Sequence, residues 1–390
     1  MALVDPSQAA SFDQSAVYKL DLSEVLSSIL LDDTDFVSVI GISGETATQT
    51  KHSWVEDALN ATSAIQSGGS SAQLALGTTS GTVLDLSASH ITRSKITAGT
   101  LLKDALSGKT EVIQVTAVAA GSACTVTRGY GGTSAITHAA GATWEIISNP
   151  RPQGMAGPKD ESTARTLVYN YTQIFSKGVK ITGTASAIDH AGISNEDDYQ
   201  IDLRLRELKR ELDRTCIMGA RAGSDVGAST YGTMGGIIEF VGFIGAQNVS
   251  GTAETLTPSV LNTMAKQVFD DGGMPDMILV GGVQKQKIST FDQEFRTSTM
   301  DSRRAGYTIE QFVSDLGWNL RVVVDRWVPN DVCLVLDSSK IKILPLTGRS
   351  FFLEKLGKTG DSNDWQIVGE YTMEVRNAAE AHAYHFNLKQ

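Results

Sequence analysis

The chain has 390 residues, beyond the ~250–300 residues at which one hydrophobic core stops growing, so the sequence predicts two or three domains. Hydrophobic residues account for 41% and charged residues for 20%, a composition that can fold and that excludes disorder throughout the chain. The formal net charge of −11 would repel a phosphate backbone, which argues against sequence-specific reading of DNA or RNA.

The first 35 residues form an acidic arm in which Lys19 is the one cation. Five apolar residues within it recur at i, i+3, i+4, i+7 and i+8, which predicts one stripe of a short helix: Leu22, Val25, Leu26, Ile29 and Leu30. A helix of about ten residues is shorter than the ~12–15 residues that hold alone in water, so the stripe must dock on other apolar surface. That surface is either the core of the same subunit or a neighbouring subunit, and the pattern favours neither.

The N-terminal residues give no indication of export, because Asp5 stands where a signal peptide has positive charge and no apolar stretch follows. We therefore expect the protein to stay in the cytoplasm. The best candidate for a membrane span, residues 235–246, is interrupted by Glu239, so we expect no crossing of a bilayer.

Alternation of side chains predicts a strand over 36–43, and extended backbone over 46–59 and 166–181. Between them, residues 73–149 are rich in Gly, Ala, Ser and Thr and carry a charge of 5 − 4 = +1, unlike the acidic remainder. This segment reads as an inserted all-β domain. Its predicted strands are 82–86, 111–118, 124–127 and 143–147.

The clearest predicted helix spans residues 194–218, with Ser194 and Asp197 as a capping arrangement. Its apolar stripe consists of Ile201, Leu205, Leu208, Leu212 and Cys216. Its other faces carry pairs of opposite charge, Asp202 with Arg206 and Glu207 with Arg210, which indicate a solvated or subunit-facing surface.

Mixed α/β structure follows. Thr257 caps a predicted helix over 258–269, residues 277–280 form a strand, and a second helix begins after Gly281 and Gly282. Residues 320–327 and 332–336 are predicted to form a hairpin. Near the C-terminus, alternation predicts a strand in which every second residue lies on one face, and a further strand is predicted to run to Leu388. That face consists of Trp365, Ile367, Gly369, Tyr371, Met373 and Val375.

No catalytic pattern is complete. Gly281 and Gly282 with Lys285 lack the spacing of a phosphate-binding loop, and residues 41–45 lack the last glycine of a nucleophile elbow. Three separated cysteines, Cys124, Cys216 and Cys333, form no CxxC pair, so they are expected to be reduced and buried.

Two polar pairs near the C-terminus are weak candidates. His382 and His385 would point to opposite faces of a strand, which argues against a shared metal and for packing or surface roles. Glu370 and Glu374 share one strand face, where paired carboxylates could perform acid/base chemistry, but a solvated face is the expected explanation. Two classes follow: a structural protein defined by its interfaces, or an unrecognised hydrolase that uses these two glutamates.

Six motifs, in this order, resemble the major capsid proteins of tailed bacteriophages, which have the HK97-like fold. They are the segments His-Ser-Trp-Val-Glu-Asp-Ala-Leu at 52–59, Lys-Ile-Thr-Gly-Thr-Ala-Ser-Ala-Ile at 180–188 and Leu-Arg-Glu-Leu-Lys-Arg-Glu-Leu at 205–212, followed by 273–281, 314–321 and 360–375. The resemblance covers nearly the whole chain outside the insertion. A phage tail or fibre component, which could also combine Gly-rich β-domains without an active site, is the alternative, but the long charged helix and the α/β region fit it poorly.

The resemblance implies an α+β fold with an extended hairpin called the E-loop, a peripheral domain that carries the long spine helix, and an axial domain. The implied boundaries are 1–35 for the N-terminal arm, 36–72 and 150–178 for the E-loop, 73–149 for the inserted small β-domain, 179–220 and 340–390 for the peripheral domain with spine helix 194–218, and 221–339 for the axial domain.

The resemblance also implies a non-enzymatic subunit, without cofactor or metal, that assembles into hexamers and pentamers of an icosahedral head around double-stranded DNA. The implied partners are further copies of the chain, portal and scaffolding proteins, decoration proteins, and packaged DNA held without sequence specificity, with no membrane. Its location would be the virion, after assembly in the host cytoplasm. The candidate residues of the subunit interfaces are the arm stripe (Leu22, Val25, Leu26, Ile29 and Leu30), Trp54, Glu56, Asp57, Arg303 and Arg304.

Overall fold

The computed structural model divides the chain into two compact units, Met1–Trp54 with Leu167–Gln390, and Val55–Thr166. The residues that the structure describes are 35–57, 59–60, 62–66, 82–86, 91, 94–119, 123–139, 141–154, 162–163, 165–187, 195–223, 231–245, 248–291, 311–357 and 360–390. The boundary between the units falls within two paired strands, β1 (Lys51–Glu56) and β8 (Thr166–Tyr171).

A four-stranded sheet in the first unit is built around the long strand β17 (Ser362–Val375). One edge of β17 pairs antiparallel with β9 (Gln173–Thr182), from Ser362 opposite Thr182 to Tyr371 opposite Gln173. The other edge pairs with β16 (Phe352–Lys355) and β15 (Ile341–Pro345). The predicted apolar face is confirmed in its C-terminal half, where Tyr371, Met373 and Val375 are fully buried.

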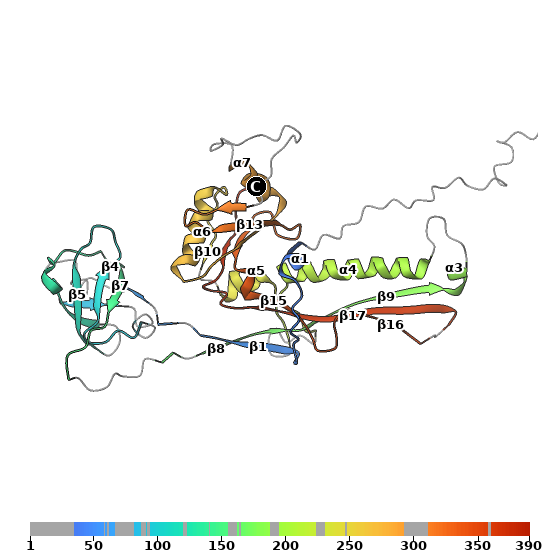
Figure 1. Ribbon diagram of the computed structural model, residues 1–390, viewed down its shortest axis with the longest axis horizontal. Coiled ribbons are helices and arrows are strands. Elements are labelled where there is room, and N and C mark those ends of the chain that lie inside the picture. Colours follow the sequence, from blue (N-terminus) through green and yellow to red (C-terminus); the bar gives the residue numbers. More distant parts are fainter. Residues whose placement is uncertain are drawn as a thin grey trace, which may run out of the picture. The chain divides into compact units, whose positions relative to one another are not determined.

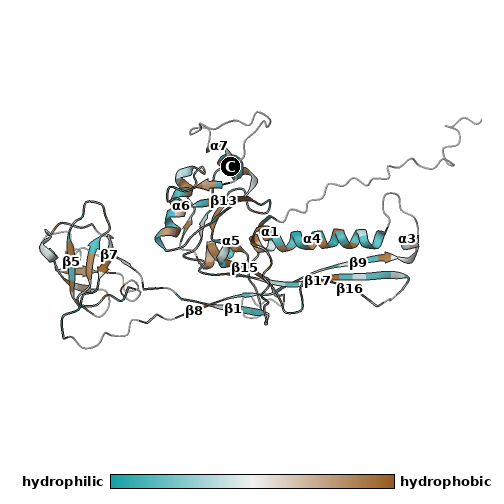
Figure 2. Ribbon diagram, in the orientation of Figure 1, coloured by the Kyte–Doolittle hydropathy of each residue, from teal (hydrophilic) through white to brown (hydrophobic). Residues whose placement is uncertain are grey.

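Helix α4 (Glu196–Met218) lies along β9 and β17 (Figure 1). Asn195, rather than Ser194, caps it by accepting a hydrogen bond from the Asp197 amide. The predicted stripe is confirmed: Leu208, Leu212 and Cys216 are buried, and Ile201 and Leu205 pack partly exposed against the same core. Figure 2 shows the remaining surface of α4 as mainly hydrophilic, as the pattern of charged pairs indicates.

A second, six-stranded sheet has the order β10-β18-β14-β11-β13-β12. Its strands are β10 (Val249–Ser250), β11 (Met277–Val280), β12 (Gln311–Val313), β13 (Asn319–Val324), β14 (Cys333–Leu336) and β18 (Ala383–His385). The helical segments beside it and at the first sheet are α3 (Gly183–Ala187), α5 (Ile237–Glu239), the π-helix η4 (Phe240–Ile244), α6 (Pro258–Asp270), α7 (Gly282–Thr290) and η6 (Ser338–Lys340). The predicted strand 277–280 and the two predicted helices beside it are confirmed.

The predicted hairpin of 320–327 with 332–336 is wrong. Strand β11 lies between these two segments, parallel to β13 and antiparallel to β14. All four residues of β11 are buried, so this strand needs a neighbour on each edge to pair its backbone groups. The turn residues around Pro329 therefore join strands that are not adjacent.

The predicted strand over 36–43 is also wrong, because residues 35–40 form the helix α1 (Asp35–Ile40). The ring of Phe36 is fully buried, and Gly41 ends the helix with a φ of 76° while its amide bonds to the Val37 carbonyl. The first-turn amides of α1 bond to two buried carboxylates described below. This tertiary anchoring outweighs the local alternation of apolar residues.

The second unit is a small β-structure with its own core. Its strands are β2 (Ser63–Ile65), β3 (Val83–Asp85), β4 (Leu101–Asp104), β5 (Val112–Val118), β6 (Ala123–Thr127) and β7 (Thr143–Ser148), with the 3₁₀ turn η3 (Tyr130–Gly132). They follow the order β2-β7-β4-β5-β6-β3. A bridge between Gln66 and Leu86 joins the two outermost strands, so the sheet closes on itself and hides its edges.

The four predicted strands of this unit are present, and β4 was missed. Strand β2 precedes residue 73, so the sheet begins earlier in the chain than the predicted insertion. The core is centred on Trp144, Leu102 and Ile113, none of which is exposed to solvent. Among the described residues, no helix is both long enough and apolar enough to cross a membrane.

Replacing Leu208 by Ala tests the packing of α4. The side chain is fully buried, so its truncation leaves a cavity and should destabilise the subunit by about 2–5 kcal/mol. Thermal and urea unfolding of the subunit measure this change. Leu353→Ala on β16, where the side chain is 46% exposed, is the control and should have little effect. Equal melting temperatures for both variants would contradict the described packing.

Candidate functional site

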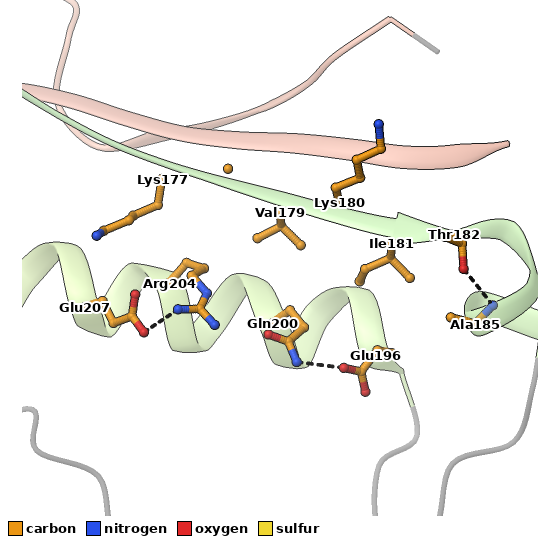
Figure 3. A pocket seen from close by; sticks show the side chains of 11 residues that line it. Lys177, Val179, Lys180, Ile181, Thr182, Ala185, Glu196, Gln200, Arg204 and Glu207 are labelled. Atoms are coloured by element: carbon orange, nitrogen blue, oxygen red, sulfur yellow. Dashed lines mark hydrogen bonds and ion pairs between the residues drawn. The ribbon is translucent and has the colours of Figure 1, made fainter. Parts of the chain in front are cut away.

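A groove of about 600 Å³ lies between α4 and β9. Six consecutive strand residues, 177–182, line one side, and Glu196, Gln200, Arg204 and Glu207 of α4 line the other. In Figure 3 the side chains of Val179 and Ile181 point from the strand toward the helix. Both are 7% exposed, so the bottom of the groove is apolar and its helical wall is polar.

Most charges along the groove are already paired within the subunit. Arg204 forms an ion pair with Glu207, and Gln200 donates a hydrogen bond to Glu196. Lys177 lies 3.6 Å from a Glu211 oxygen, and Lys180 lies 3.7 Å from an Asp364 oxygen. Such partly exposed pairs contribute at most about 1 kcal/mol each, so they can exchange partners when another surface approaches.

Two buried carboxylates hold the start of α1 against α4. The Val37 amide donates to Oδ1 of Asp213 at 2.8 Å, and the Phe36 amide donates to Oδ2 of Asp325 at 3.1 Å. Asp213 is on α4, and Asp325 follows β13, so three separate parts of the chain meet here. This cluster therefore fixes the position of the chain at the start of α1.

Desolvation by burial raises the pKa of the Asp213 carboxyl well above its ordinary value, and the neighbouring charge of Asp325 raises it further. The hydrogen bond from the Val37 amide opposes this shift. Asp213 therefore holds a proton at pH values where an exposed aspartate is ionised. One feature of the sequence indicates that Asp213 is buried: it lies three residues before Cys216, so it is close to the buried stripe of the helix.

Trp54, proposed as an interface residue, lies in the core of the first unit with 6% of its surface exposed. Its ring is 5.8 Å from that of Phe240 and 5.9 Å from that of His52. This burial leaves little of the indole available to another subunit.

Glu56 and Asp57 belong to the second unit. Glu56 is partly buried, whereas Asp57 is exposed and accepts a 2.9 Å hydrogen bond from the Thr163 hydroxyl. Arg165 approaches the same Asp57 carboxylate at 4.0 Å. The other proposed interface residues lie outside the described residues: Leu22, Val25, Leu26, Ile29, Leu30, Arg303 and Arg304.

Glu370 and Glu374 do not form a solvated face, because they are only 5% and 2% exposed. Glu370 pairs with Arg349 at 2.9 Å and accepts a hydrogen bond from the Thr172 hydroxyl.

Glu374 pairs with Arg376 and with His52. Burial alone would raise the pKa of Glu374, but the hydrogen bonds from His52 and Arg376 lower it overall. Both carboxylates of the proposed hydrolase site are thus occupied by separate structural partners.

The two C-terminal histidines also serve packing. Burial lowers the pKa of His382 to about 3, so the ring is neutral and its Nδ1 accepts from the Asp337 amide. His385 is 1% exposed and bonds to Glu254 at 2.9 Å. No group of His, Cys, Asp and Glu able to hold a metal occurs in the part of the chain that the structure describes.

The cysteines are buried and free, as expected. Burial raises the pKa of Cys124 to about 11 and that of Cys333 to about 12, so neither thiol is an ionised nucleophile near neutral pH.

The second unit contains a buried ionic cluster that the sequence analysis missed. Glu111 pairs with Arg128 at 2.6 Å, and His138 lies between Glu111 at 3.0 Å and Asp104 at 2.7 Å. Burial alone would raise the pKa of Glu111, but hydrogen bonds from Arg128, from His138 and from the Ile136 and Gly129 amides lower it to about 2. Every member has a charged neighbour inside the unit, so the cluster ties strands to loops and exposes no reactive group.

Among the described side chains, the buried glutamates at 111, 370 and 374 are paired with arginines, and the groove between α4 and β9 is open to solvent. This arrangement suits contacts between proteins. Comparison with solved structures identifies the fold. The chain aligns over 98% of its length with a chain of the cyanophage A-1(L) capsid asymmetric unit, covering 100% of it at 11% identity and a TM-score of 0.54. It aligns over 100% with a chain in the capsid of an empty GTA particle, at 9% identity and a TM-score of 0.50.

These likenesses confirm the HK97-like capsid fold. The chain matches the family described as SU10 major capsid protein over residues 6–389, and it therefore belongs to that family. A curated relative, the major capsid protein of Escherichia phage Phieco32, is 21% identical over 280 residues, which cover 59% of this chain and 79% of the relative. The protein is a shell-forming structural protein of a phage head.

Replacing Asp213 by Asn tests the carboxylate cluster. The native stability contributed by the protonated Asp213 is complete below the ordinary carboxyl pKa and is lost as the pH rises through the raised value. The melting temperature of the parent should therefore fall between about pH 5 and about pH 9. The Asp213→Asn variant keeps the acceptor for Val37 without the ionisation, so its curve should be flatter and should lie above that of the parent at alkaline pH.

Asp202→Asn makes the same substitution at an exposed position on α4 and serves as the control, with a pH dependence like that of the parent. Parallel curves for the Asp213→Asn variant and the parent would show that Asp213 does not carry the titration.

Proposed function

We propose that copies of this chain form hexamers and pentamers that close into an icosahedral head around double-stranded DNA. The family match across nearly the whole chain carries this proposal. Assembly would take place in the host cytoplasm. The acidic balance of −11 supports a container wall that does not bind its genome tightly through phosphates.

The domain roles belong to the same proposal. Residues 1–35 act as the arm, the segments that enter and leave the second unit act as the E-loop, and α4 acts as the spine helix of the peripheral domain, 179–220 with 340–390. Residues 221–339 act as the axial domain. The second unit is the inserted β-domain, and the position of β2 supports a start before residue 73.

Portal and scaffolding proteins, decoration proteins and packaged DNA are the proposed partners, and no membrane or cofactor takes part. We propose a purely structural role without catalysis. Its support is that the best carboxylate pair in the sequence, Glu370 and Glu374, is buried and separately neutralised by Arg349 and Arg376.

Expression of the full chain with the scaffold that its genome encodes tests shell formation. Electron microscopy should show closed particles or capsomer rings, because a major capsid protein forms the shell from many copies of itself. Light scattering should give masses that are multiples of 41.6 kDa. A preparation that contains monomers alone under these conditions would contradict the proposal.

The apolar stripe of the arm is proposed to dock on a neighbouring subunit. Burial of a Leu or Ile side chain contributes roughly 1.5–3 kcal/mol, so Leu26→Asp with Ile29→Asp should abolish assembly while the subunit stays folded. Particle yield and circular dichroism of the subunit measure both effects.

Ser27→Asp with Ser28→Asp is the matched control, because it adds two charges to the same segment on the helix face opposite the stripe. This control should assemble. Parent-like yields from the stripe variant would exclude the docking.

A further inference from the structure

One edge of β9 is open. On β17, Glu370 directs its backbone away from β9: its amide bonds to the Arg349 carbonyl, and its carbonyl accepts from the Leu346 amide. Glu370 lies opposite Ile174, so in an antiparallel ladder Ile174 and every second residue after it direct their backbone groups away from β17. Within the described chain, the amides and carbonyls of Ser176, Gly178 and Lys180 have no strand partner on that side.

The groove lies along this open edge. Residues of both strand faces line it, such as Val179 from one and Lys180 from the other, as expected for a strand seen from its edge. Figure 3 shows Val179 and Ile181 directed to the α4 side and Lys180 directed to the opposite side. An extended segment could pair with β9 there, with one face on α4 and the other beside Lys180.

Residues 12–20 of the arm have the matching pattern. In an extended segment, one face would carry Phe12, Gln14, Ala16, Tyr18 and Leu20, and the other Asp13, Ser15, Val17 and Lys19, so the first face is mainly apolar and the second mainly polar. The apolar face suits the groove bottom at Val179 and Ile181.

Charge does not drive this assignment. The groove is lined by the cations Lys177, Lys180 and Arg204 and the acids Glu196 and Glu207, and Lys177 and Lys180 also pair with Glu211 and Asp364, so the local balance is 3 − 4 = −1. Residues 1–34 hold six acids and Lys19, a balance of 1 − 6 = −5. The docking of the arm therefore depends on backbone pairing and apolar contact.

The attachment point of the arm is also close enough. Asp213, which binds the start of α1, is six residues along α4 from Glu207 and seventeen from Glu196, or roughly 9 Å and 26 Å at 1.5 Å per residue. The fifteen residues from Leu20 to Asp35 can span at most about 50 Å. The arm can reach the groove of its own subunit.

We propose that residues 12–20 occupy the α4–β9 groove of the same subunit as an additional strand on the open edge of β9. The arm thereby extends the sheet before any other copy binds. This docking site is separate from the proposed contact of the arm stripe with a neighbour, which involves residues 22–30.

Hydrogen exchange on the unassembled, full-length subunit tests the added strand. The amides of Ser176, Gly178 and Lys180 should be protected in the parent and should exchange at least ~10-fold faster in the variant Phe12→Asp with Tyr18→Asp, which places two charges on the apolar face. The control Ser11→Asp with Ser15→Asp adds the same charge to the polar face and should retain protection. Rapid exchange in the parent, or equal protection in the Phe12→Asp, Tyr18→Asp variant, would overturn the proposal.

A photo-activated cross-linker in place of Lys180 identifies the occupant. The expected product has the mass of a single chain and joins position 180 to residues 12–20. A product of two chains, a link to another segment or no link would overturn the assignment. A cross-linker in place of Leu353, on β16 at the other side of β17, should not capture the arm. Because these measurements use unassembled subunits, failure of shell formation and failure of the groove assignment give different results.

Discussion

The antiparallel ladder between β9 and β17 is the interaction on which the first unit depends. It joins residues 173–182 to 362–371, so β9, which follows β8 directly, is fixed to the last long strand of the chain. Helix α4 then packs its buried stripe on this pair, and β15 and β16 pair with the far edge of β17. Loss of this pairing would remove the surface for α4, and with it the position of Asp213, which holds α1.

The long periodic elements were predictable, because one sheet or helix face sets their pattern over many residues. The helix at 196–218, the strand at 362–375 and the strand at 277–280 followed from spacing alone. The short helix α1 did not, since carboxylates more than 170 residues away determine its first turn. The prediction that β13 and β14 form a hairpin failed for a similar reason. It assumed that strands adjacent in sequence are adjacent in space, whereas β11 lies between them.

The candidate site was less predictable than the fold. Glu370 and Glu374 looked solvated because strand alternation indicates a shared face but not what covers it. Their partners, Arg349 and His52, come from distant segments. In the second unit, the cluster of Glu111, Arg128 and His138 joins residues with no common motif, so only tertiary structure reveals it. The groove also could not be predicted from the sequence, because it lies along the edge of β9 that does not pair with β17.

The pairing of β1 with β8 has a practical meaning for protein engineering. The two chain segments that connect the second unit run side by side as they enter and leave it, and that unit has a core of its own. A foreign domain whose termini lie close together meets the same geometric requirement. The position between these strands is therefore a natural place to graft a foreign domain, with the ladder of β9 and β17 left intact.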